Sequence, residues 1–187
     1  MTRAETADRL VGVMGVVEAE LEDLFEHDLH AKRIGSLAGA TIGALTEGRL
    51  GVHAIGIGLA EARGLRQKHT IKQVDRLLSN AGINVWELFD TWVPYLLAQR
   101  TEALVALDWT DFDDDDQSTL ALHLVSAHGR ATPLVWKTIL KSELKGNRSG
   151  YEDEVLARFL EAAPPEDQGH GIGRPPASLG ANSRPAS

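Results

Sequence analysis

An acidic segment between two apolar runs is the part of this chain best suited to metal chemistry. Residues 104–107 are apolar, Asp108 follows them directly, and a second apolar run covers residues 120–125. This pattern predicts two buried strands joined by an acidic connection. A carboxylate at the end of a buried strand is costly unless something neutralises it, and a divalent metal ion is a common neutraliser. Asp108 is therefore the candidate metal ligand; a structural hydrogen-bonding role is the alternative.

A basic segment offers a second kind of chemistry, the binding of phosphate. The pattern predicts a helix-turn-helix made of residues 52–64 and 68–78, with Ile71, Val74 and Leu78 on the buried face of the second helix. Cations four residues apart on the opposite face could neutralise DNA phosphates. An ordinary helical hairpin with a solvated basic face has the same spacing, so that alternative stays open. The candidate DNA-binding residues are Arg66, Lys68, Lys72 and Arg76.

Other patterns that suggest a ligand are weaker. The run starting at Asp111 has neither glycine at the sixth position nor glutamate at the twelfth, so it is not a calcium loop, and residues 113–116 are expected to form a solvated turn. His27, Asp28 and His30 offer too few ligands for a convincing metal site. The glycine-rich residues 169–173 lack the strand and helix that a phosphate loop requires.

The elements that must position these residues change type along the chain. Residues 1–98 are expected to form a helical region, and from Glu102 the period becomes strand-like. A capping-box pattern from Ser149 to Glu152 is expected to open the last helix. The expected helices are 4–30, 37–45, 52–63 with Gly64 as its cap, 68–78, 86–97 with a kink or break at Pro94, and 151–162; the expected strands are 104–107, 120–125 and 131–138, with a tight turn at His128 and Gly129.

Composition limits the classes of protein to consider. The 187 residues include no cysteine, which excludes thiolate metal sites and fits a reducing compartment. No apolar run approaches membrane-spanning length and no secretory signal is evident, so we expect a cytoplasmic protein without a membrane partner. The net charge of −8 does not exclude DNA, because local basicity governs phosphate binding. Residues 164–187 are rich in Gly, Pro, Ala and Ser and are expected to be disordered.

Four segments together resemble one family. They are RGLRQKHTIKQVDRLLSN (63–80), ALVALDWTDF (103–112), HGRATPLVWKT (128–138) and YEDEVLARFL (151–160). Their order and spacing are similar to those of the DDE transposases of bacterial insertion sequences, in the IS-four-type group that includes Tn-five-like enzymes. The resemblance covers about residues 37–165.

The resemblance implies an α+β protein: a helical DNA-binding region at residues 1–98, then the first half of a ribonuclease-H-like domain at residues 102–162, with three antiparallel strands and a helix. It places the first catalytic carboxylate, a magnesium ligand, at Asp108. In such enzymes three carboxylates hold two metal ions, normally Mg²⁺, that drive DNA cleavage and strand transfer. The partners implied are DNA, at transposon ends, and a second transposase chain, either a homodimer partner or a full-length enzyme.

The sequence also departs from the family pattern. Residues after 162 offer no candidate for the second or third carboxylate, and we therefore expect a C-terminally truncated transposase that is inactive in cleavage by itself. Whether the chain is an enzyme stays open at this point. The alternatives are a DNA-binding regulator or inhibitor of transposition that acts without catalysis, and an acidic helical interaction protein unrelated to DNA.

Overall fold

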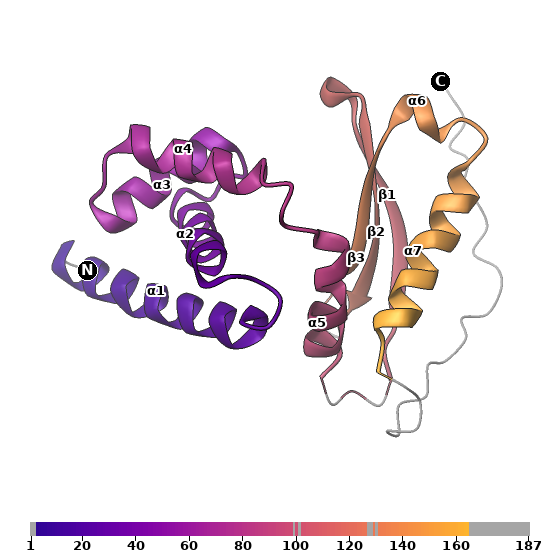
Figure 1. The fold of residues 1–187 in the computed structure, drawn as a ribbon, viewed down its shortest axis with the longest axis horizontal. Coiled ribbons are helices and arrows are strands. Elements are labelled where there is room, and N and C mark those ends of the chain that lie inside the picture. Colours follow the sequence, from indigo (N-terminus) through magenta and orange to yellow (C-terminus); the bar gives the residue numbers. More distant parts are fainter. Residues whose placement is uncertain (1–2, 99, 101, 127–128, 130, 165–187) are drawn as a thin grey trace. The chain divides into compact units, whose positions relative to one another are not determined.

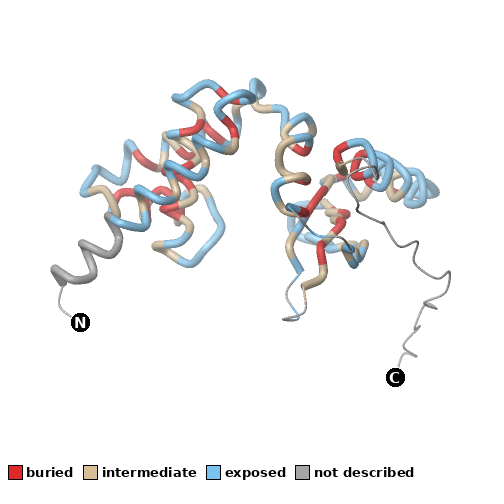
Figure 2. The backbone as a smooth tube through the Cα atoms, turned by 90° about the horizontal axis from the view of Figure 1, so that it is seen from below, coloured by how far each residue is buried: buried red, intermediate tan, exposed pale blue. Residues whose placement is uncertain are grey.

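A computed structural model describes residues 3–98, 100, 102–126, 129 and 131–164. The chain divides into two compact units, Met1–Trp92 and Val93–Ser187, each with buried segments of its own (Figures 1 and 2). The predicted α+β class is confirmed. The elements are α1 (Arg3–Phe25), α2 (Ala31–Glu47), α3 (Val52–Arg63), α4 (Gln67–Leu78), α5 (Val85–Leu97), β1 (Val105–Phe112), a 3₁₀ turn η1 (Asp113–Asp115), β2 (Gln117–Val125), β3 (Ala131–Leu140), α6 (Lys141–Leu144) and α7 (Arg148–Ala162).

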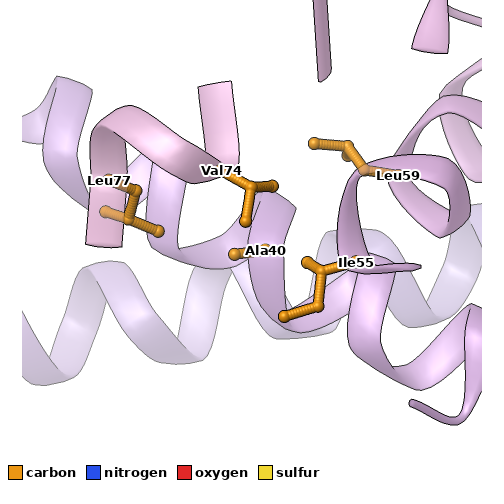
Figure 3. Close-up of a cluster of buried hydrophobic side chains, with 5 residues drawn as sticks. All are labelled: Ala40, Ile55, Leu59, Val74 and Leu77. Atoms are coloured by element: carbon orange, nitrogen blue, oxygen red, sulfur yellow. The ribbon is translucent and has the colours of Figure 1, made fainter. Parts of the chain in front are cut away.

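Helices α2, α3 and α4 share one hydrophobic core. Its buried side chains come from all three helices and point toward one another (Figure 3). Leu59 of α3 is fully buried and Val74 of α4 almost so. Burying such a side chain stabilises the fold by about 1.5–3 kcal/mol. This cluster therefore fixes α4 against α2 and α3; its members are Ala40, Ile55, Leu59, Val74 and Leu77.

Three glycines let these helices approach backbone to backbone. A Cβ added at Gly43 of α2 would lie 2.2 Å from the carbonyl oxygen of Ile55 in α3, and one at Gly58 would lie 2.2 Å from the carbonyl oxygen of Gly43. A Cβ at Gly56 would lie 2.5 Å from the Cα of Ile71 in α4. Glycine weakens an isolated helix, but here it permits two close helix crossings.

The first helix is shorter than predicted and the second is longer. Helix α1 ends at Phe25 and α2 begins at Ala31, so a continuous helix through residue 30 is wrong. The chain turns at Glu26–Asp28, and the Nδ1 atom of His30 accepts a hydrogen bond from the backbone N–H of Lys32, which caps α2. Phe25, Leu29 and Ile34 are buried at this corner, and apolar side chains before and after it pack against them.

The sheet is antiparallel and three-stranded, as predicted, and its strand order is β1-β2-β3. Two of its strands are longer than predicted. Strand β1 continues past Asp108 to Phe112, and β2 begins at Gln117 instead of residue 120. The acidic turn is thereby reduced to η1 and Asp116, whose φ of 52° closes the hairpin. β3 agrees with its prediction to within two residues. Gly129 has a φ of 71°, whereas His128 lies outside the described residues.

Helix α7 packs on one face of the sheet, against β2 and β3. The predicted capping box is wrong, because α7 begins at Arg148 and Ser149 already lies in its first turn. The carboxylate of Glu152 accepts a hydrogen bond from the indole Nε1–H of Trp109 at 2.9 Å instead of capping the helix. The predicted end at Ala162 is confirmed. The predicted disordered tail lies outside the described residues, except for Pro164.

Candidate nucleic-acid interface

A tight connection joins α3 to α4, as the predicted helix-turn-helix requires. Gly64 adopts the left-handed conformation with a φ of 63°, and its backbone N–H bonds to carbonyl groups of the last turn of α3. The chain then extends through Arg66, which is the N-cap residue of α4. The hydroxyl of Thr70 is buried and donates to the Gly56 carbonyl oxygen at 2.6 Å. This bond and the Gly56 contact fix the position of α4 relative to α3.

The predicted cations lie on one side of α4 and its core contacts on the other. Lys68, Lys72 and Arg76 are exposed, and at about 100° per residue each step of four turns only about 40° around the helix. The buried residues Thr70, Val74 and Leu77 occupy the opposite face. The prediction placed Leu78 on the buried face, which is wrong: Leu78 is 62% exposed and Leu77 takes its place.

The four candidate DNA-binding cations, Arg66 included, form no ion pair within the described part of the chain, and all four are exposed. Other basic residues are paired: Arg63 with Glu18, Lys137 with Glu154, and Lys141 with Asp113. An unpaired cation can release counterions and bind phosphate without first breaking a protein contact. The basic side of α4 is therefore electrostatically available.

A shallow groove borders this basic side. The first turn of α3 contributes Val52 and His53, and α4 contributes Gln67, Lys68, Ile71, Lys72 and Asp75. His53 and Gln67 were not among the predicted site residues. The proximity of His53 to Lys68 comes from the α3–α4 crossing at Gly56, which the local sequence pattern does not specify.

Asp108 is not at a buried strand end. It lies in the interior of β1, opposite Ala121 of β2, and it is exposed. Trp109 faces α7, and because successive strand side chains alternate, Asp108 points to the other face of the sheet. No described residue pairs with its carboxylate by a hydrogen bond or an ion pair. The burial cost that suggested a metal ion is therefore absent, and so is the alternative structural hydrogen bond.

The neighbouring acids do not complete a magnesium site. Asp111 accepts a hydrogen bond from the Ser118 hydroxyl at 2.7 Å, and Asp113 pairs with Lys141. Within the described ranges, no three His, Asp or Glu side chains come together in a group that could hold a metal ion. The described residues therefore do not fit the two-metal centre that the family resemblance implies. At the other histidine–aspartate group considered above, the Asp28 carboxylate accepts a hydrogen bond from the Thr91 hydroxyl at 2.6 Å.

Comparison with protein-family models finds no match, and neither curated proteins nor solved structures provide one. Among the described helices, none is long and apolar enough to cross a membrane.

Proposed function

We propose that this chain binds DNA through the basic side of α4. The observation that carries the proposal is a set of four exposed cations that form no ion pair with any described residue. Three of them, Lys68, Lys72 and Arg76, lie opposite the buried face of α4. An α-helix fits the major groove of B-DNA, and Lys68 to Arg76 span about 12 Å along the helix axis. Contacts of this kind to phosphates would give affinity and strong salt dependence without specifying a sequence.

We further propose that the chain belongs with the DDE transposases of the IS-four-type group and binds transposon ends in the cytoplasm. The four ordered sequence segments support this assignment. A helical unit followed by an antiparallel three-stranded sheet and a helix is the element order that such a protein would have. On this proposal the strands and helices that follow α5 are the opening part of a ribonuclease-H-like domain.

DNA binding without cleavage is the activity we assign to the described residues. Among the described residues, Asp108 belongs to no group of three or more His, Asp or Glu side chains that could hold a metal ion, and a single carboxylate cannot position two metal ions. The chain would then act as a regulator or inhibitor of transposition, by occupying transposon ends or by pairing with a complete transposase or with a second copy of itself.

Salt-dependent DNA binding tests the proposal. Fluorescence anisotropy with a mixed-sequence duplex of 30 base pairs would give Kd at several salt concentrations. Each phosphate contact contributes about −0.9 to the slope of log K against log salt. The Lys72→Ala/Arg76→Ala variant should therefore bind more weakly and lose about 1.8 from the slope. Lys32→Ala, which removes an exposed cation from α2, is the matched control and should leave the slope unchanged.

Two results would contradict the proposal. An unchanged slope in Lys72→Ala/Arg76→Ala would refute phosphate binding by α4 and favour an interaction protein unrelated to DNA. Magnesium-dependent nicking of the duplex by the wild-type chain, abolished in Asp108→Ala, would refute the assignment of binding without cleavage.

A further inference from the structure

A second basic site lies in the other unit, at the end of the sheet where the β1–β2 hairpin turns. It is a cavity that is wide open to solvent, with a volume of about 600 Å³, bordered by β1, α6 and the first turn of α7. Three basic side chains from different segments converge on it, with a single acid among them. The lining residues are Asp111, Lys141, Leu144, Lys145, Gly146, Arg148 and Ser149.

Some charged side chains of this cavity have a bonding partner and others do not. Lys141 pairs with Asp113 of the acidic turn, and that hydrogen bond raises the pKa of the Lys141 amino group. Asp111 is held by the hydroxyl of Ser118. Lys145 and Arg148, in contrast, are exposed and have no ion-pair partner among the residues that the structure places. The lining carries three positive charges and the negative charge of Asp111, and Asp113 adds a second negative charge, so the site has a net charge of +1. Lys145 and Arg148 are the two cations of this site that form no ion pair with a described residue.

Arg148 is held in place without its charge being neutralised. Its guanidinium carbon lies 5.0 Å from the centroid of the Trp109 ring. The Trp109 indole is fixed in turn by its hydrogen bond to Glu152. A cation–π contact of this kind restrains the guanidinium and leaves its N–H groups free to donate. Arg148 is thus preorganised to bind a planar or tetrahedral oxyanion at the cavity.

We propose that this cavity binds a phosphate group, with Arg148 and Lys145 as its charged donors and the Ser149 hydroxyl as a neutral one. A guanidinium matches phosphate oxygens in geometry, and a lysine adds a mobile point charge. The phosphate could belong to a nucleic-acid backbone or be free in solution, and both would be recognised by the same donors. The site lies outside α4 and does not depend on DNA binding by that helix.

NMR titration of the full-length chain tests this site. Inorganic phosphate should produce saturable shifts in the amide signals of residues 145–149 and in the Trp109 indole N–H signal, while sodium chloride at equal ionic strength should not. A hydrogen bond to a charged group typically contributes about 1.5–3 kcal/mol, so Arg148→Ala should weaken phosphate binding about tenfold or more. Lys145→Ala should weaken it in the same direction and leaves the Arg148–Trp109 contact in place, so it tests the site even if Arg148→Ala disturbs α7.

Duplex DNA, added to a Lys68→Ala/Lys72→Ala/Arg76→Ala variant, distinguishes the two sources of phosphate. Shifts at Trp109 and residues 145–149 with DNA would identify a backbone phosphate, and shifts with inorganic phosphate alone would identify a free one. No saturable shift with either ligand would overturn the proposal. Shifts that Lys145→Ala leaves unchanged, or that Lys32→Ala weakens equally, would also overturn it. Because these signals belong to another unit, failure here is distinct from failure of binding by α4.

Discussion

The crossing of α2 and α3 gives a sharp test of the fold that presents the basic helix. Gly35 and Gly43 both lie inside α2, but their surroundings differ. A Cβ at Gly35 would meet nothing within 4 Å, whereas a Cβ at Gly43 would lie 2.2 Å from the Ile55 carbonyl oxygen and 3.0 Å from the Leu59 nitrogen. The same substitution, glycine to alanine, should therefore have opposite effects at the two positions.

The expected magnitudes follow from these distances. A carbon–oxygen contact of this kind is normally about 3.3 Å or longer, so Gly43→Ala must move α2 and α3 apart by about 1 Å. A gap of that size forfeits a quarter to a half of the dispersion energy at the contact, and overpacking costs about 1–3 kcal/mol. The gain in helix propensity returns about 1 kcal/mol. We expect Gly43→Ala to be less stable by up to about 2 kcal/mol, and Gly35→Ala to be more stable by about 1 kcal/mol.

Urea unfolding followed by circular dichroism at the helix band measures both variants. Amide hydrogen exchange in α3 shows whether the change is local to this core. The free energies of unfolding of the two variants should differ by about 1–3 kcal/mol, because both gain the same helix propensity and only Gly43→Ala is overpacked. If Gly43→Ala were as stable as Gly35→Ala, the backbones of α2 and α3 would not touch at this crossing. The conclusion that this crossing helps to hold α4 in place would then be wrong.

Two further predictions concern single polar contacts. Thr70→Val removes the buried hydroxyl that donates to Gly56 and should lower the free energy of unfolding by about 1–2 kcal/mol. Thr70→Ser keeps a hydroxyl and should lose much less stability. Equal urea midpoints for the Val and Ser variants would contradict this prediction. The hydrogen bond to Asp113 raises the Lys141 pKa above its ordinary value of 10.5. The contribution of this pair to the stability of the folded chain is therefore complete below pH 10.5 and is lost as the pH rises through the folded-state pKa. In Asp113→Asn the Lys141 pKa, followed by carbon NMR of its side chain, should fall, and an unchanged pKa would show that the pair does not form in solution.

The helices nearest the proposed DNA surface were the most predictable from sequence. Residues 52–63 and 68–78 combine a helical apolar period with a glycine stop at Gly64, and both signals are local. The exposure of Lys72 and its neighbours follows from the same period. The close packing of the three helices does not follow from that period. Considered from the local sequence alone, Gly43 and Gly56 only weaken a helix. Their role becomes visible only when the partner helix is in place.

The errors in the second unit have a common physical cause. Asp108 and Asp111 disfavour a strand by propensity, so the apolar run was expected to end before them. Their cost is small in the folded chain, because Asp108 faces water and Asp111 bonds to Ser118. Trp109 and Phe112 favour a strand and continue it to the hairpin turn. In the same way, Glu152 bonds to Trp109 on a neighbouring strand, and local sequence cannot reveal that partner.

The basic helix and Asp108 therefore support functional inference to different degrees. Each α4 cation can contact a phosphate by itself, so a row of exposed, unpaired cations already supports an inference of DNA binding. A carboxylate in a two-metal centre acts only together with others placed within a few ångströms. Asp108 lies exposed in β1 without such a group among the described residues. The resemblance of the surrounding sequence still marks Asp108 as a candidate ligand, but the geometry supports binding by α4 more strongly than catalysis at β1.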